Sequence, residues 1–224
     1  MSEKKIFVSR DSQSVQALIE YMNSRGVEVE ARPLIRYEAV EFEIPEANFE
    51  WVFFSSRNAV HFFFTQKPPG NHKYGAIGPG TASELSKYVQ VDFEGRDYDT
   101  GATASNFSLI AGESKVLFPC SHKSLRTVQQ SLPSSQVLEI ICYQSFPVET
   151  PIGRADAYVV LSPENARALL KSNETDRGAL FFVLGESTAD TLRNHDISRV
   201  QLLPHGDSIH WAHTIAEVLF SAPH

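Results

Sequence analysis

The segments Trp51-Val-Phe-Phe-Ser-Ser-Arg-Asn-Ala59 and Tyr158-Val-Val-Leu-Ser-Pro-Glu-Asn-Ala166 follow one pattern. In each, an apolar run typical of a buried strand leads into a turn with Ser and Asn, and a helix pattern follows. The offset between the two segments is 107 residues, as the spacing from Asn58 to Asn165 shows. This pair of segments suggests that the chain contains an internal repeat.

A second pair of segments has the same offset. Ala76-Ile-Gly-Pro-Gly-Thr-Ala-Ser-Glu-Leu85 matches Val183-Leu-Gly-Glu-Ser-Thr-Ala-Asp-Thr-Leu192, which brings a Gly-x-x-Thr turn into register in both. Matching residues at one constant spacing, in matching local contexts, are not expected by chance. The two pairs therefore define a repeat whose unit contains at least two strand-to-helix turns.

A further pair shows that the repeat is circularly offset. The strand Lys115-Val-Leu-Phe-Pro119 with a helix expected over 124–132 resembles Lys5-Ile-Phe-Val-Ser9 with a helix expected over 14–23. The partner of the later segment thus lies at the start of the chain. The N-terminal strand and helix consequently belong with the C-terminal half, and the middle of the chain forms an insertion.

This arrangement predicts the fold class. Short apolar strands that alternate with helices indicate βαβ units and a parallel sheet. We expect an α/β protein of two similar lobes, each a parallel sheet flanked by helices, joined by a two-stranded β linker. Lobe 1 would comprise 1–36 plus 147–224, and lobe 2 would comprise 37–146 with the linker strands. Two lobes joined in this way predict a ligand cleft between them.

Composition limits the function. The 224 residues are 42% hydrophobic and 21% charged, which is ordinary for a globular protein. The net charge of −7 argues against a nucleic-acid surface, because neutralising phosphates requires clustered Lys and Arg. The chain has no apolar run long enough for a transmembrane helix and no signal-peptide pattern at its start. We therefore expect a cytoplasmic protein that does not bind membranes.

Metal and nucleotide chemistry find no support in the sequence. Cys120 and Cys142 lie in apolar segments and are expected to be reduced core residues. The eight histidines show no metal-ligand spacing, His205 and His210 included, and no Gly-rich phosphate-binding motif is present. Asp97 and Asp99 have no facing carboxylate that would form a catalytic pair.

Several short motifs, in their order, spacing and doubling, resemble the uroporphyrinogen-III synthase family over nearly the whole chain. They are Ser9-Arg10, Phe53-Phe-Ser-Ser-Arg-Asn-Ala59, Ile77-Gly-Pro-Gly-Thr-Ala82, Leu117-Phe-Pro-Cys120, Cys142-Tyr-Gln-Ser145, Leu161-Ser-Pro163 and Leu184-Gly-Glu-Ser-Thr-Ala189. The resemblance implies the two-lobed fold, a lyase activity without cofactor or metal, and the substrate hydroxymethylbilane, a linear tetrapyrrole with eight carboxylates. It also implies a monomer, with a transient contact to the preceding enzyme of the pathway.

The resemblance implies one catalytic residue. Tyr143 matches the family's tyrosine that points into the cleft and is the favoured acid for loss of the substrate hydroxyl. The other interpretation of Tyr143 is a strand aromatic that fills the seam between the lobes. A phenol with a pKa near 10 is a weak acid, but it can donate a hydrogen bond to a departing hydroxyl.

Substrate carboxylates are expected to bind at the turns. We interpret Thr81 and Thr188 as helix N-caps, and a helix start offers free N–H groups to an anion. Strand-end serines have an ordinary turn role as the alternative to substrate contact. Arg10 corresponds to a basic residue that the family often has, with surface salt-bridging as its alternative. The expected substrate contacts are Arg10, Ser55, Ser56, Gly78, Thr81, Ser162, Gly185 and Thr188.

Two functions remain open from the sequence. The first is synthesis of uroporphyrinogen III from hydroxymethylbilane, with inversion of the last pyrrole and loss of water, as the resemblance implies. The alternative is a non-catalytic binding or regulatory homologue with the same fold. Retention of Tyr143 together with both Gly-x-x-Thr turns favours the enzyme.

Overall fold

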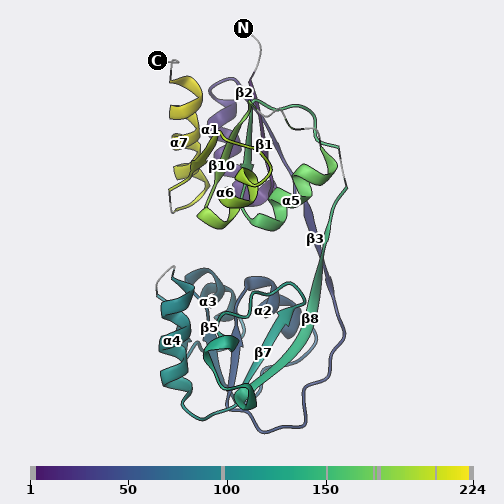
Figure 1. The fold of residues 1–224 in the computed structure, drawn as a ribbon, viewed down its shortest axis with the longest axis vertical. Coiled ribbons are helices and arrows are strands. Elements are labelled where there is room, and N and C mark those ends of the chain that lie inside the picture. Colours follow the sequence, from purple (N-terminus) through teal and green to yellow (C-terminus); the bar gives the residue numbers. More distant parts are fainter. Residues whose placement is uncertain are drawn as a thin grey trace. The chain divides into compact units, whose positions relative to one another are not determined.

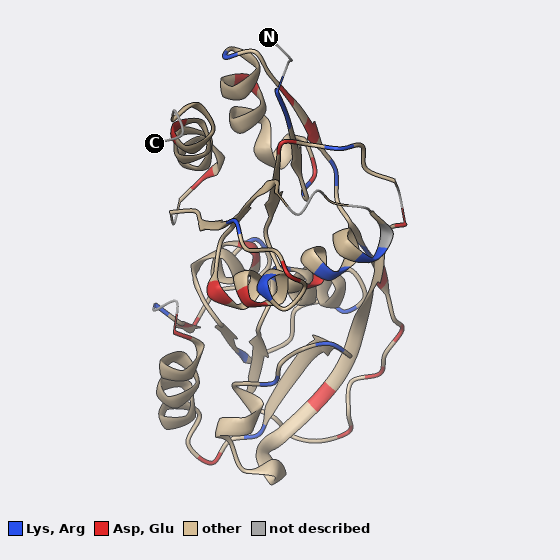
Figure 2. Cartoon of the chain, turned by 45° about the horizontal axis from the view of Figure 1, so that its top comes forward, with Lys and Arg blue, Asp and Glu red and all other residues tan. Residues whose placement is uncertain are grey.

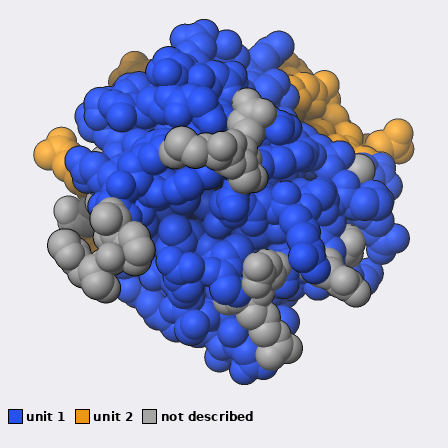
Figure 3. Space-filling view, turned by 90° about the horizontal axis from the view of Figure 1, so that it is seen from above, with its two compact units in different colours: residues 1–36, 146–224 blue, residues 37–145 orange. Residues whose placement is uncertain are grey.

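A computed structural model describes residues 4–96, 99–149, 151–173, 175, 178–204 and 206–221 of the chain. The chain divides into two compact units, which are coloured separately in Figure 3. Unit 1 contains residues 1–36 and 146–224, and unit 2 contains residues 37–145. The lobe boundaries expected from the repeat lie at 36/37 and 146/147.

Unit 1 is built on a five-stranded sheet with the order β11-β10-β9-β1-β2, in which all neighbouring strands are parallel (Figure 1). The central strands β1, β9 and β10 are short and mostly buried, which is typical of a sheet covered on both faces. Their bounds are β1 Lys4–Val8, β2 Val27–Ala31, β9 Ala157–Val160, β10 Leu180–Val183 and β11 Val200–Leu202.

Helices cover both faces of the unit 1 sheet. Alternate strand residues point to opposite faces, so Val159 packs with α1 and α7 while Tyr158 packs with α5 and α6. The helices are α1 Gln16–Asn23, preceded by the 3-10 turn Gln13–Val15, α5 Pro163–Ser172, α6 Glu186–Arg193 and α7 Ser208–Phe220.

Unit 2 is built on a six-stranded sheet with the order β3-β8-β7-β4-β5-β6. The pairs β8–β7, β7–β4, β4–β5 and β5–β6 are parallel. The strands are β3 Ile35–Ala39, β4 Trp51–Phe54, β5 Lys73–Ala76, β6 Phe93–Glu94, β7 Val116–Ser121 and β8 Val137–Pro147.

The unit 2 sheet is also covered on both faces. Helices α2 and α3 pack with Val52 and Phe54 on one face, and α4 packs with Trp51 and Phe53 on the other. The helices are α2 Arg57–Phe64, α3 Pro79–Leu85 and α4 Thr100–Ala111, with 3-10 turns at Gln129–Ser131 and Ser134–Gln136.

Strand order confirms the predicted fold class. Written from the other edge, the first sheet is β2-β1-β9-β10-β11, and the second, without β3, is β8-β7-β4-β5-β6. The segments that match at an offset of 107 residues occupy equal places in the two orders, β4 with β9 and β5 with β10. The N-terminal β1 takes the place that β7 has in the other sheet. The circular offset of the repeat is therefore a property of the fold.

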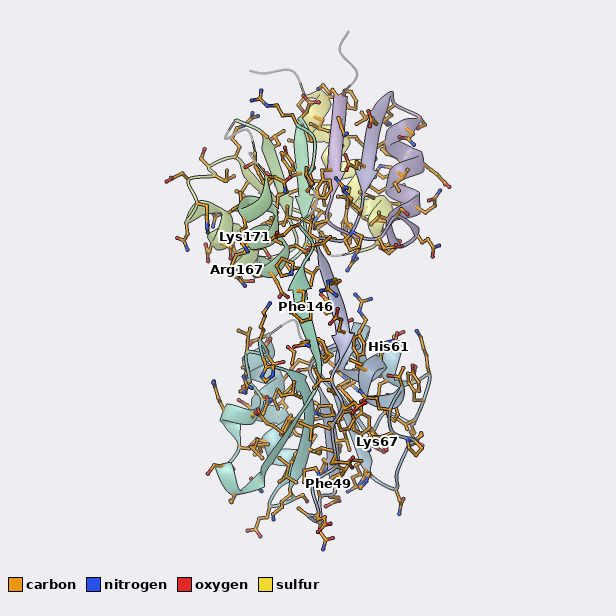
Figure 4. The ribbon with its side chains drawn as sticks, turned by 90° about the vertical axis from the view of Figure 1, so that its right-hand side faces the viewer. Phe49, His61, Lys67, Phe146, Arg167 and Lys171 are labelled. Carbon is orange, nitrogen blue, oxygen red and sulfur yellow. The ribbon has the colours of Figure 1, made fainter. Side chains whose placement is uncertain are left out.

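Strands β3 and β8 form the two-stranded linker through which the chain passes between the units. The N–H of Val148 donates to the carbonyl of Leu34 at 2.8 Å, and the N–H of Val40 donates to the carbonyl of Cys142 at 3.0 Å. Partner numbers on one strand fall as those on the other rise, so the two strands are antiparallel. Phe146, labelled in Figure 4, lies on β8 with the guanidinium of Arg36 4.8 Å from its ring centre.

The turn after β6 requires glycine at position 95. A Cβ at Gly95 would meet the carbonyl oxygen of Ile77 and would lie 2.6 Å from the side chain of Thr103. Because a backbone oxygen cannot swing away as a side chain can, Gly95→Ala should cost about 1–3 kcal/mol of unfolding free energy. Urea denaturation of the variant and the parent protein measures this difference in unfolding free energy.

Gly80→Ala is the matched control for Gly95→Ala. Position 80 lies in α3, and a Cβ there would have no neighbour within 4 Å. Alanine is the better helix former, so Gly80→Ala should be neutral or slightly stabilising. Equal stability of the Gly95→Ala and parent proteins would show that the atoms around position 95 move apart without a cost in free energy.

Candidate functional site

The predicted site residues of unit 1 lie where strands end. In a parallel sheet the carboxyl ends of the strands share one edge, where open α/β sheets bind ligands. Ser9 and Arg10 follow β1, Ser162 follows β9 and Gly185 follows β10. The N–H of Leu161 donates to the Ser9 hydroxyl at 3.3 Å, which joins the ends of β1 and β9 directly. Unit 1 thus brings its predicted residues to one edge.

Unit 2 has the same arrangement. Ser55 and Ser56 follow β4, Gly78 follows β5, and Tyr143 lies on β8 beside the end of β7. These positions share the carboxyl edge of the second sheet. The structure therefore places every predicted substrate contact at the edge that this architecture uses for ligands, although in two separate units.

Ser56 and Ser162 are matched helix caps. The hydroxyl of Ser56 accepts the N–H of Ala59 at 3.1 Å, and that of Ser162 accepts the N–H of Asn165 at 3.2 Å. Both serines have the extended backbone of an N-cap, with φ of −159° and −157°. The ordinary turn role is therefore present at both positions. It leaves the hydroxyl protons available for a further partner.

The expectation that Thr81 and Thr188 are N-caps is wrong. Gly78 and Gly185 occupy the N-cap positions of α3 and α6, and each threonine is the third residue of its helix. The N–H groups of Thr81 and Thr188 donate to the carbonyls of these glycines, both at 3.0 Å. An extended glycine can turn the chain into the helix without a side-chain cap, so the threonine moves inside the first turn.

This correction changes how each turn would bind an anion. No side chain caps α3 or α6, so the N–H groups of their first turns are not used by a capping residue. Thr81 and Thr188 are 7% and 3% exposed. Each helix start therefore offers the N–H groups that precede its threonine, that of Gly80 in α3 and those of Glu186 and Ser187 in α6, with the buried threonine behind them.

Acidic charge near the start of α6 is balanced locally. Glu186 is the first residue of α6, and Arg193 contacts its carboxylate and that of Asp190, each at 3.0 Å. These two hydrogen bonds raise the pKa of Arg193. Figure 2 shows acidic and basic residues interspersed along the ribbon, so the net charge of −7 is not gathered in one element.

The basic residues near the predicted site differ in setting. Arg10 stacks on Trp211 of α7, with 5.7 Å from the guanidinium carbon to the ring centre. Lys123 is exposed, and its ammonium donates to the carbonyl of Ser145 at 3.2 Å. His61 is exposed on α2 (Figure 4). The Arg10–Trp211 contact was not predicted, because a Trp in an apolar helix pattern only indicates core.

Tyr143 is enclosed by aromatic rings. It is 7% exposed, with Phe62 stacked on it at 5.4 Å between ring centres and Tyr37 edge-on at 6.0 Å. The phenol oxygen lies 3.1 Å from the hydroxyl oxygen of Ser56. Burial raises the pKa of Tyr143, although hydrogen bonds from Ser56 and Ser121 act in the opposite direction. The phenol is therefore protonated at neutral pH and can donate.

Ser121 is a site residue that was not predicted. It ends β7, is 6% exposed, pairs with Tyr143 of β8, and its side chain lowers the pKa of that phenol. The sequence contained a partial signal, because Ser121 directly follows the quoted motif Leu117-Phe-Pro-Cys120. Its contact depends on the pairing of β7 with β8, which a single sequence does not give.

Both cysteines are free and buried, as predicted. Burial raises the pKa of the Cys120 thiol to about 11 and that of Cys142 to about 12, so both are unreactive at neutral pH. Within the described ranges, no three His, Cys, Asp or Glu side chains cluster in a way that could hold a metal ion. Asp97 and His205 lie outside the described residues.

A helical membrane span depends on the length and composition of the helices in the part of the chain that the structure describes. No helix there combines the length and the apolar character that crossing a bilayer requires. The longest helices, α4 and α7, lie against the sheets of their own units through buried faces.

Fold and site together define a class: two-unit α/β proteins with doubled parallel sheets, two linker strands and a ligand edge on each sheet. A sequence profile for the family described as Uroporphyrinogen-III synthase HemD matches residues 16–205, which is most of the chain. The chain belongs to the uroporphyrinogen-III synthase family. No curated protein sequence matches it significantly.

Solved structures show the same fold. The uroporphyrinogen-III synthetase of Helicobacter pylori is 15% identical, with a TM-score of 0.71 over 96% of this chain and 99% of that one. A mutant uroporphyrinogen III synthase of the thermophile Thermus thermophilus is 12% identical, with a TM-score of 0.61 over 98% of this chain and 100% of that one. At this identity the likeness supports the fold alone.

Proposed function

We propose that this protein is a catalytic synthase that converts hydroxymethylbilane to uroporphyrinogen III and releases water, as a lyase. The observation that supports catalysis most is the buried phenol of Tyr143, held 3.1 Å from the Ser56 hydroxyl at a ligand edge. A purely structural tyrosine could fill this place with its ring alone. The hydroxyl partners give the phenol oxygen a defined direction.

The substrate's carboxylates would bind at the two carboxyl edges. Each edge provides an uncapped helix start, and such starts attract anions through N–H groups and the helix dipole. The contacts would be Arg10, Ser55, Ser56, Gly78, Thr81, Ser162, Gly185 and Thr188.

Tyr143 would assist loss of the substrate hydroxyl. Electrons from the first pyrrole nitrogen expel the hydroxyl, which takes a proton donated by the phenol and leaves as water. The product of that step is an electrophilic azafulvene. The last ring attacks it through its substituted α-carbon to form a spiro intermediate, and the bond from that carbon to the preceding methylene bridge then breaks. That methylene bonds to the free α-carbon of the same ring, which closes the macrocycle with the ring inverted, and the proton lost from this carbon returns to the phenolate of Tyr143. No cofactor is needed, since no electrons are gained or lost overall.

Placement is the larger part of this catalysis. The azafulvene forms readily, and the linear tetrapyrrole also closes spontaneously without inversion. Holding both ends of the chain in one geometry favours the inverted closure, and such orientation effects can be large. The protein would work as a monomer in the cytoplasm, with a transient contact to the enzyme that supplies the unstable substrate.

A non-catalytic binding homologue is the alternative, and substrate consumption separates the two. Hydroxymethylbilane is supplied with and without catalytic amounts of the protein, and its disappearance is followed by chromatography. We expect consumption faster than the spontaneous rate and proportional to protein concentration. A binder would leave the rate unchanged or, in stoichiometric amounts, slow it.

A further inference from the structure

The pairing of β7 with β8 contains an irregularity at Tyr143. Cys120 pairs with Ile141, but Ser121 pairs with Tyr143, so Cys142 is an extra residue on β8. Such an insertion is a β-bulge, which bends the strand and redirects side chains. The bulge lies at the end of β7, where the strand meets the ligand edge.

The bulge changes the face on which Tyr143 lies. Neighbouring residues of a regular strand point to opposite faces. Here Ile140, Cys142 and Tyr143 all pack in the same core cluster, on the face covered by α2 and α3. The thiol of Cys142 fills the bulge, 3.7 Å from the carbonyl oxygen of Cys120 and 3.9 Å from that of Ala59. The extra residue thus directs Tyr143 toward Ser56.

Three serines lie beside Tyr143 or behind its pairing partner, and one of them has its hydroxyl next to the phenol oxygen. Ser56 lies 3.1 Å from that oxygen and is already an acceptor for the N–H of Ala59. Ser121 is the pairing partner of Tyr143 and is buried. Behind it, the Ser124 hydroxyl accepts the N–H of Ser121 at 3.1 Å and lies 3.4 Å from the Ser121 hydroxyl.

We propose that Ser121 is a positioning residue that donates its hydroxyl proton to the phenol oxygen of Tyr143 and so leaves the phenol proton for the substrate. This inference rests on the proposed role of Tyr143 as the proton donor. A phenol oxygen can accept two hydrogen bonds while it donates one. When Ser56 and Ser121 both donate to the phenol oxygen, the phenol donates its own proton to neither serine. Ser124 holds Ser121 in place from behind.

The same geometry makes the phenol a better acid than burial alone would allow. A donor to the phenol oxygen stabilises phenolate more than phenol. The titratable groups that act on Tyr143 are the thiols of Cys120 on β7 and Cys142 on β8, and both stay neutral at pH 7. The rings that pack against it come from Phe62 on α2 and Tyr37 on β3.

The experiment titrates this one phenol without substrate. 3,5-Difluorotyrosine is incorporated at position 143 of the full chain, because its fluorines move ionisation toward neutral pH, where the protein stays folded. Fluorine NMR then follows ionisation with and without Ser121→Ala. Ser131→Ala is the matched control, since the Ser131 hydroxyl bonds to the carbonyls of Ala104 and Val128 and is not part of the site.

We expect Ser121→Ala to raise the pKa of the fluorinated phenol and Ser131→Ala to leave it unchanged. In the unlabelled protein, Ser121→Ala should lower kcat about tenfold, less than the ~10²–10⁴-fold expected when the general acid itself is lost, with KM nearly constant. Ser121→Thr, which keeps the hydroxyl, should restore kcat. An unchanged or lowered pKa in Ser121→Ala would overturn the proposal, because Ser121 would then not donate.

The test of Ser121 can be distinguished from the test of the proposed acid role of Tyr143. If Tyr143→Phe retains full activity, the acid role of Tyr143 fails, whatever the titration shows. If Tyr143→Phe is impaired but Ser121→Ala does not move the titration, the inference about Ser121 fails alone.

Discussion

Tyr143→Phe should lower kcat by about 10²–10⁴-fold while a measurable rate of type III synthesis remains. The substitution removes the phenol oxygen and its contact with Ser56, but the ring contacts with Phe62 and Tyr37 stay. Placement of the substrate would persist, and the pyrrole nitrogen would still expel the hydroxyl. KM should change little, because the phenol acts on the departing group.

Tyr74→Phe is the matched control for this variant. Tyr74 is also buried and has a raised pKa, caused mainly by burial. Its hydroxyl exchanges hydrogen bonds with the backbone of Gly70, away from the proposed site. It should lose some stability and no activity. Complete inactivity of a folded Tyr143→Phe protein would mean that the phenol is essential, and unchanged activity would mean that the acid lies elsewhere.

Thr81→Val and Thr188→Val should each weaken binding of the tetrapyrrole product by roughly ten- to a hundredfold. Loss of one hydrogen bond to a buried carboxylate costs about 1.5–3 kcal/mol. Valine has nearly the shape of threonine, and both positions are buried inside helices, so the folds should survive. Isothermal titration calorimetry with each variant measures the loss.

Two comparators decide whether the helix starts are responsible. Lys123→Ala should matter little, because an exposed charge contributes little. Thr191→Val makes the same chemical change in α6, where the Thr191 hydroxyl only donates to the carbonyl of Ser187. A greater loss of affinity in Lys123→Ala than in either Thr81→Val or Thr188→Val would show that recognition depends on side-chain charge.

The architecture could be predicted because the chain contains the repeating unit twice. Two turns at one offset of 107 residues located equal strands in the two sheets, and the match of the N-terminal strand with a central one gave the circular order. The helix patterns after these turns also located α2, α3, α5 and α6. Such signals are local and repeated, so a single sequence can contain them.

In the segment after β7, the structure differs from the helix that the sequence predicts. The spacing of Leu125, Val128 and Leu132 predicts a helix over 124–132, as its repeat partner has. The structure contains only the 3-10 turn Gln129–Ser131 there. Arg126 has a φ of 59° and pairs with Glu139 on β8 at 3.0 Å, and a left-handed residue interrupts a helix. A long-range ion pair accompanies this local departure, and no local pattern reveals it.

The sequence predicted where the site residues lie along the chain better than it predicted the contacts that they make. Strand-end turns identified the correct edges, but the caps of α3 and α6 were misassigned by three residues, from glycine to threonine. The bulge at Cys142, which aligns Ser121 with Tyr143, has no sequence signature of its own. It arises from pairing between strands, and its consequence is that Tyr143 lies opposite Ser121 and reaches Ser56.

The identity of the cyclic product tests the central claim most directly. Hydroxymethylbilane is incubated with the protein, with heat-denatured protein and alone, and the uroporphyrin isomers are separated by chromatography after oxidation. We expect predominantly type III product with the native protein and type I product in both controls, because only a substrate that is bound by the protein inverts its last ring before closure. Type I product alone in all three samples would contradict it.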